Sequence, residues 1–113
     1  MKKIEAVIRL EKLEDLKAEI NRDFEISGMT VTQVLGYANQ KGMKEYVRGK
    51  AVITSLLPKV KVSFVVEEKD LESVIGRILL ICSTGEVGDG KIFVSPVEEV
   101  IRIRTRERGK EAI

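Results

Sequence analysis

The spacing of apolar residues along this chain changes its period, and this change limits the folds that the chain can adopt. From residue 3 to residue 10 every second side chain is apolar, which predicts a half-buried strand. From residue 11 to residue 24 apolar side chains recur at helical spacing, which predicts a helix with one buried face. The residues that set these two periods are Ile4, Ala6, Ile8 and Leu10, and then Leu13, Leu16, Ile20 and Phe24. A strand and a helix that covers it are therefore expected first.

The same two periods return in the rest of the chain. Residues 29–37 are rich in β-branched side chains and predict a second strand, and residues 60–66 alternate and predict a third. Residues 70–82 have helical spacing, with Asp70 as a candidate N-cap, and residues 92–94 predict a further strand. The order is βαββαβ with a C-terminal extension. This is the order of the ferredoxin-like α+β fold, in which two helices cover one face of a four-stranded antiparallel sheet.

The second face of this predicted sheet also needs cover. It would carry Val7, Val65 and their neighbours, and an apolar face of this kind is normally buried against another molecule. We therefore expect a closed homo-oligomer. The length of the chain suits one domain that spans residues 1–113.

A long segment, residues 38–57, interrupts the pattern between the second and third predicted strands. It holds glycines and charged side chains without a sustained period, and alternation resumes only after Pro58. Loops longer than about 12 to 15 residues within a compact domain are usually functional or disordered. We expect a mobile loop that binds a partner protein.

The composition argues against several classes of protein. The 20 basic and 18 acidic residues leave a net charge of +2, so nucleic-acid binding is not expected. Histidine is absent, which removes the commonest general base and metal ligand. Aromatic residues make up only 4% of the chain, and we place Phe93 and the single cysteine, Cys82, in the core. No apolar run approaches the roughly 20 residues that span a bilayer, so a cytoplasmic, non-catalytic protein is expected.

Three groups of residues are candidates for binding anions. Gly88-Asp89-Gly90-Lys91 combines flexible backbone with a cation, which suits phosphate, although such a sequence is often only a tight turn. Arg102, Arg104 and Arg106 alternate along a last predicted strand, residues 97–104 and beyond, and form either a phosphate-binding row or a solvated strand edge. Considered together, the glycine turn and the arginine row favour phosphate.

The third group lies around the long loop. Gln40 offers a neutral oxygen that could ligate Mg²⁺, and Lys59 and Arg9 could hold carboxylates if the flanking strands pair. Scattered surface polar residues are the alternative interpretation.

Several motifs, in matching order and spacing, resemble those of the PII nitrogen-regulatory signal transduction proteins (GlnB/GlnK type) over nearly the whole chain. They are Gly28-Met29-Thr30-Val31-Thr32, Gln40-Lys41-Gly42, Arg48-Gly49, Leu57-Pro58-Lys59-Val60-Lys61, residues 84–97 and Ile101-Arg102-Ile103-Arg104-Thr105. The resemblance implies a homotrimer with ATP or ADP in clefts between subunits, Mg²⁺ beside ATP, and 2-oxoglutarate as a candidate effector. Because the sequence offers no histidine and no paired catalytic carboxylates, at most slow ATP hydrolysis is expected.

The resemblance assigns roles to individual residues. The residues implied for the nucleotide are Gly28, Thr30, Gly36, Ala38, Asn39, Gln40, Val65, Gly88, Asp89, Gly90, Lys91, Arg102 and Arg104. Those implied for 2-oxoglutarate are Gln40 and Lys59, and Gln40 is also implied as the ligand of Mg²⁺. Arg9 joins them as a candidate because of its position at the end of the first predicted strand.

By the same resemblance, residues 38–57 bind the target, which would be a membrane transporter or an enzyme of nitrogen metabolism, with recruitment to the membrane by a transporter. The loop residues concerned are Lys41, Gly42, Tyr46, Arg48, Gly49, Lys50 and Val52. Val52 stands where many relatives have a uridylylated tyrosine, and Lys50 stands where cyanobacterial relatives have a phosphorylated serine, so neither modification is expected. A divergent PII-like regulator of a non-nitrogen transporter or pathway, with another small effector, is the alternative.

Overall fold

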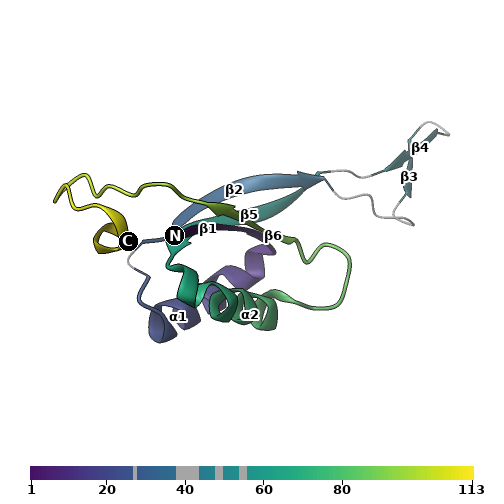
Figure 1. The fold of residues 1–113 in the computed structure, drawn as a ribbon. Coiled ribbons are helices and arrows are strands. Elements are labelled where there is room, and N and C mark those ends of the chain that lie inside the picture. Colours follow the sequence, from purple (N-terminus) through teal and green to yellow (C-terminus); the bar gives the residue numbers. More distant parts are fainter. Residues whose placement is uncertain (27, 38–43, 48–49, 54–55) are drawn as a thin grey trace.

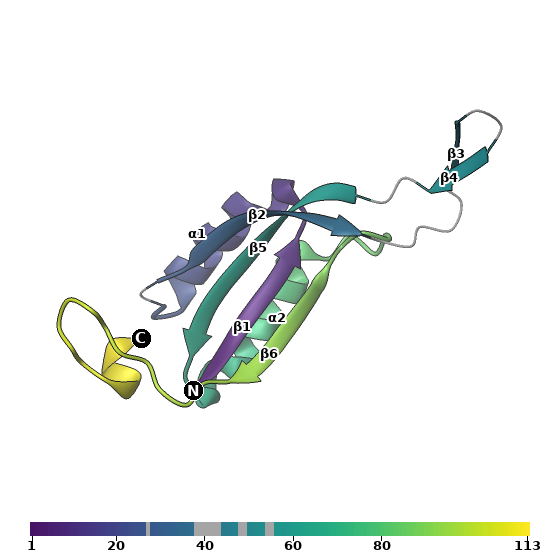
Figure 2. The same ribbon diagram turned by 90° about the horizontal axis from the view of Figure 1, so that it is seen from above.

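Four antiparallel strands form the main sheet in the order β2-β5-β1-β6, and two α-helices cover one of its faces (Figure 1 and Figure 2). This computed structural model describes residues 1–26, 28–37, 44–47, 50–53 and 56–113. The main elements are β1 (Lys2–Ile8), α1 (Leu13–Asp23), β2 (Thr30–Tyr37), β5 (Leu56–Val66), α2 (Leu71–Cys82) and β6 (Lys91–Pro96). The predicted ferredoxin-like α+β fold is confirmed.

The core lies between the helices and the sheet, where the predicted alternation places it. Its residues come from β1, β5 and the inner faces of both helices, and none is more than 5% exposed. They are Ile4, Ala6, Ile8, Leu16, Ile20, Val60, Val62, Phe64, Val66, Val74, Ile78 and Cys82. Burial also raises the pKa of the Cys82 thiol. Cys82 is therefore a core residue, as predicted.

The opposite face of the sheet is open in the single chain. Because Glu5 pairs with Phe93 and Val7 pairs with Lys91, these side chains lie on the face away from the helices. Phe93 is 53% exposed, so its predicted place in the core is wrong. Three consecutive apolar residues in β6 could not indicate which of them faces inward.

Both helices begin with a 3-10 turn, η1 (Leu10–Lys12) and η2 (Glu68–Asp70). Asp70 precedes α2 but makes no capping hydrogen bond with its side chain, because its backbone is already helical at φ −97° and ψ −9°. The predicted side-chain cap is therefore wrong. Leu10 is 43% exposed rather than buried, because β1 ends at Ile8.

Within the long connection, β3 (Lys44–Val47) and β4 (Lys50–Ile53) form an antiparallel hairpin beyond the ends of β2 and β5 (Figure 1). The prediction of a segment without regular structure is wrong for these residues and for Leu56 and Leu57, the first two residues of β5. Pro58 is tolerated inside β5 because pairing of β5 with β1 reaches only Val60. The structure does not describe residues 38–43, 48–49 and 54–55. The predicted mobility of the loop concerns these residues.

The C-terminal segment differs most from the prediction. No strand covers residues 97–104. Instead Ile101 forms an isolated bridge with Arg108, and the Arg102 amide donates to the Glu107 carbonyl at 2.9 Å. Arg106 has a φ of 65°, so the chain turns here and the three arginines do not form a row on one strand. The alternation in sequence could not indicate that these backbone groups pair within a local turn. A last 3-10 turn, η3 (Gly109–Ala112), follows.

An ionic cluster joins the two helices on their outer side. Arg77 of α2 contacts both Asp23 and Glu19 of α1, and its guanidinium lies 5.7 Å from the centre of the Phe24 ring. Arg22, and after it Arg77, hold the pKa of the Asp23 carboxyl below its usual range through hydrogen bonds. None of the helices in the described ranges is both long and apolar enough to span a membrane.

Asp23→Asn is expected to lower the free energy of unfolding at neutral pH, with an effect that shrinks in acid. The folded pKa of Asp23 is depressed, so its contribution is fully present above the pKa of an unfolded aspartate, about 3.9. It is lost as the pH falls through the lower folded pKa. Urea titrations of both proteins between about pH 7 and about pH 3 measure the difference. A difference that stays constant over this range would contradict the prediction.

Candidate functional site

An open cavity of about 450 Å³ lies on the uncovered face of the sheet, where β2, β5 and β6 meet the turn before β6. The predicted site residues that line it are Gly36, Lys59, Gly88, Gly90 and Lys91. They come from three separate parts of the sequence. The structure therefore brings together the predicted glycine turn and the base of the long loop.

Glycine is required in the turn that forms one wall of this cavity. Gly88 and Gly90 have φ values of 104° and 99°, a region that disfavours residues with a Cβ atom. A Cβ atom on Gly90 would lie 1.7 Å from the carbonyl oxygen of Val7 in β1. The turn can pack against β1 only because this atom is missing.

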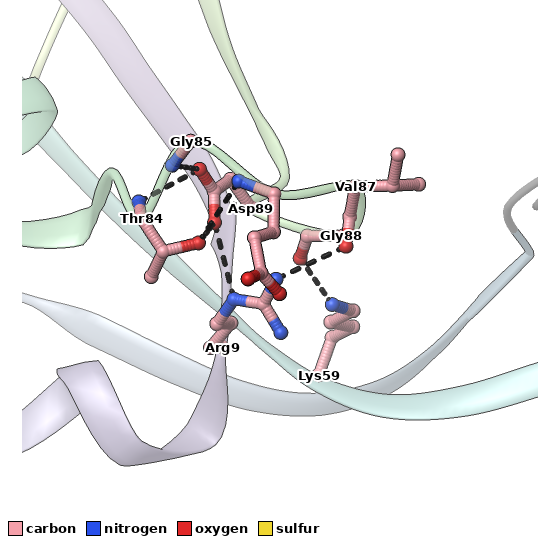
Figure 3. A network of polar contacts seen from close by, with 8 residues as sticks. Arg9, Lys59, Thr84, Gly85, Val87, Gly88 and Asp89 are labelled. Carbon is pink, nitrogen blue, oxygen red and sulfur yellow. Dashed lines mark hydrogen bonds and ion pairs between the residues drawn. The ribbon is translucent and has the colours of Figure 1, made fainter.

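Lys59 contributes a buried cation to the cavity. The residue is only 8% exposed, and its Nζ donates a hydrogen bond to the carbonyl oxygen of Gly88 (Figure 3). Within the described ranges, no carboxylate forms an ion pair with Lys59. A buried ammonium group whose acceptor is a neutral carbonyl is unfavourable unless an anion joins it.

Arg9, which follows the end of β1, lies beside Lys59. Its Nη2 donates to the carbonyl oxygen of Val87 at 3.0 Å, and its Nε donates to Asp89 Oδ1 at 3.1 Å. A Cβ atom on Gly88 would lie 3.4 Å from both Arg9 Nη2 and Lys59 Nζ. The predicted convergence of Arg9 and Lys59 is thus present, and the two cations meet at Gly88.

Asp89 is turned back into its own loop. Its Oδ2 accepts from the amides of Thr84 at 2.8 Å and Gly85 at 2.9 Å, and its Oδ1 accepts from the Thr84 hydroxyl as well as from Arg9 (Figure 3). These hydrogen bonds, that of the Thr84 hydroxyl first, hold the pKa of Asp89 below its usual range. The carboxylate is therefore ionised, and its hydrogen bonds come from its own loop and from Arg9.

A second group of predicted residues lies at the other end of the sheet. Thr30 pairs with Ser63, and Val65 pairs with Lys3 near the start of β1. Gly28 lies two residues before Thr30, the first residue of β2. Residues 97–113, which include Arg102 and Arg104, leave the sheet at the start of β1, where the Val97 amide donates to the Met1 carbonyl at 3.2 Å (Figure 1). The six residue steps from Lys59 to Val65 on β5 span about 20 Å. One chain therefore does not bring the two groups together.

The remaining predicted residues belong to the long connection. Ala38, Asn39, Gln40, Lys41, Gly42, Arg48 and Gly49 lie outside the described residues. Tyr46 lies in β3, and Lys50 and Val52 lie in β4. The described ranges contain no group of acidic, cysteine or histidine side chains suited to a metal ion.

Sequence reasoning missed the apolar part of the cavity. The lining residues that it did not assign are Val7, Tyr37, Leu57, Val87 and Phe93. Alternation already placed Val7 on the open face, opposite the core residues Ala6 and Ile8, but did not assign it to the site. The wall therefore combines an exposed aromatic ring with cations and glycines. This arrangement suits a ligand that has both a flat apolar part and a charged part.

Comparison with known proteins shows which family the sequence resembles over its whole length. The family model described as nitrogen regulatory protein P-II matches residues 1–107. The chain is 50% identical to the nitrogen regulatory protein P-II of Rhizobium meliloti and 48% identical to that of Microchaete diplosiphon. It is 46% identical to the protein of the same name from Synechocystis. Each match covers 100% of this chain and 100% of the relative.

Proposed function

The chain belongs to the nitrogen regulatory protein P-II family, and from this premise we propose that it senses ATP and ADP and regulates a target protein through residues 38–57. The target would be a transporter or an enzyme of nitrogen metabolism. A cytoplasmic protein that a transporter recruits to the membrane fits this role. The observation that carries the proposal is the cavity at which the glycine turn, Lys91 and Lys59 meet.

The phosphates of the nucleotide fit the charged part of this cavity. Gly88 and Gly90 allow close approach of the backbone to phosphate oxygens, and Lys91 adds a positive charge beside them. Phe93, exposed on the same face, offers a flat apolar surface for a base. Both parts of a nucleotide thus have a counterpart in the wall.

The separation of the two groups of predicted nucleotide-binding residues supports a homotrimer. Val65 lies about 20 Å from Lys59 along β5, which is too far for one nucleotide to contact both residues within a chain. A ring of identical subunits would place the second group of one chain against the first group of the next. It would also cover the exposed face around Phe93.

A small dicarboxylate such as 2-oxoglutarate is the proposed effector. Arg9 and Lys59 meet at Gly88, and both now donate to backbone carbonyls. A carboxylate is a stronger acceptor for such cations than a neutral carbonyl. Gln40, together with the nucleotide phosphates, would then hold Mg²⁺, which commonly takes few ligands from the protein itself.

The effector site lies at the base of the partner-binding loop. Gly36 pairs with Leu57, and Val34 pairs with Lys59, so both strands that lead into residues 38–55 line or adjoin the cavity. A ligand there shifts the loop by as much as its affinity differs between the loop conformations. The contact of the ligand with Lys59 would provide the physical link between the effector site and the loop.

Lys91→Ala is expected to weaken ATP and ADP binding by about tenfold, because a charge-assisted contact to phosphate is lost. Isothermal titration calorimetry of the wild type should first give a dissociation constant below about 1 mM. Lys17→Ala, which removes an exposed lysine of α1, is the matched control and should bind as the wild type does. The proposal fails if the wild type binds neither nucleotide, or if light scattering shows a monomer.

A further inference from the structure

We propose that Thr84 and Asp89 are positioning residues, which close the turn before β6 so that its glycine amides are fixed before a ligand arrives. The inference rests on the proposed function, because it concerns the same phosphate-binding turn. It changes the expected role of Asp89, which the resemblance places among the residues that contact the nucleotide.

The first observation is that the Asp89 carboxylate has no capacity left for a ligand. It accepts four hydrogen bonds, from the Thr84 amide, the Gly85 amide, the Thr84 hydroxyl and Arg9 Nε. An ionised carboxylate offers about four acceptor positions. A carboxylate aimed at phosphate would also repel it, whereas a carboxylate turned into the loop does not need to approach it.

The second observation is that the Thr84 hydroxyl is both a donor and an acceptor in the hydrogen bonds that close the turn. Its hydroxyl donates to Asp89 and accepts from the Glu86 amide at 3.2 Å, so one side chain joins the start, the middle and the end of the turn. Gly85, at φ 85°, lets the chain leave Thr84 in the required direction. Residues 84–89 thus form a ring that is closed by side chains.

The third observation is that the closed turn also fixes Arg9. Its Nε is held by Asp89 and its Nη2 by the Val87 carbonyl, and its side chain is only 22% exposed. Arg9 therefore anchors the turn to the end of β1 (Figure 3). Rigid donors lower the entropic cost of binding, which is how a residue that never touches the ligand can raise affinity.

The test compares Thr84→Val, which removes only the hydroxyl, with Thr84→Ser, which retains it. Calorimetric titration with ADP in metal-free buffer is expected to show about a three- to tenfold weaker affinity for the valine variant, at unchanged stoichiometry. The serine variant should stay within about twofold of the wild type. A merely structural role would instead lower the fraction of binding-competent protein or the melting temperature and leave the dissociation constant unchanged. Equal affinities for the valine variant and the wild type would overturn the proposal.

Asp89→Asn distinguishes a carboxylate that positions the turn from one that contacts the nucleotide directly. If Asp89 is a positioning residue, Asp89→Asn should weaken ADP binding. The double variant Asp89→Asn/Thr84→Val should bind ADP only slightly more weakly than Asp89→Asn alone, because both substitutions remove the same closure of the turn. A tighter complex would indicate that the carboxylate faces the phosphates and would overturn the proposal.

Hydrogen exchange of the ligand-free wild type and Thr84→Val proteins keeps the proposal testable if nucleotide binding itself is absent. The valine variant should lose protection at the Gly85 and Glu86 amides. Unchanged protection would refute the closure independently of the proposed function.

Discussion

Gly90→Ala is expected to destabilise the folded chain by about 2 to 6 kcal/mol, which is the sum of a strained φ and an overpacked contact. The new Cβ atom would lie 1.7 Å from the Val7 carbonyl oxygen, and this oxygen belongs to the backbone of a central strand. Neither the turn nor β1 can yield without breaking the pairing of Val7 with Lys91. Because whole domains are stable by only about 5 to 15 kcal/mol, a large part of the variant could be unfolded.

Urea denaturation of Gly90→Ala and Gly85→Ala, compared with the wild type, separates the effect of the steric clash from that of the strained φ. Gly85 also has a positive φ, 85°, but no atom lies within 4 Å of the position of its missing Cβ. Gly85→Ala should therefore lose only the conformational part, about 1 to 2 kcal/mol. If both variants lost the same stability, close packing of the turn against Val7 would not be what selects glycine at residue 90.

The period of the apolar residues was enough to predict the architecture. Alternation at Ile4, Ala6 and Ile8 and helical spacing at Leu16 and Ile20 identified both the elements and their buried faces, because each position depends on burial in one shared core. The same signal failed where backbone pairing is decided locally. Residues 97–104 alternate like a strand, but the Arg102 amide donates to the Glu107 carbonyl and the Arg106 amide donates to the Arg102 carbonyl, within a local turn.

The candidate site was predictable in its chemistry more than in its geometry. Glycines next to Lys91 indicated an anion site, and the positions of the cations Arg9 and Lys59 around the long loop brought them into consideration. No sequence pattern indicates that Asp89 closes its own loop, because a carboxylate between two glycines serves equally as a ligand or as a support. Phe93 was misplaced for a related reason, since its exposure depends on the register between β1 and β6.

Lys59→Met is expected to weaken 2-oxoglutarate binding by about 10- to 100-fold, which corresponds to the loss of a charged hydrogen-bond donor. Methionine has a similar length without the charge, and its apolar side chain suits a position that is only 8% exposed. The free energy of unfolding of the ligand-free protein should stay the same or rise, because the substitution removes a buried cation whose acceptor, among the residues that the structure describes, is the neutral Gly88 carbonyl. A substitution that weakens 2-oxoglutarate binding and does not lower the free energy of unfolding would show that Lys59 serves binding and not stability.

Lys61→Met is the matched control, because Lys61 lies two residues along β5 on the same face and is more exposed than Lys59. Titration with 2-oxoglutarate in the presence of ATP and Mg²⁺ should leave its affinity within about twofold of the wild type, since it loses no contact with the ligand. A Lys59→Met protein that was strongly destabilised would indicate that the hydrogen bond to Gly88 stabilises the fold. One that bound 2-oxoglutarate normally would remove Lys59 from the effector site. Weaker binding with undiminished stability is the result that links this buried lysine, and the base of residues 38–57 beside it, to the effector.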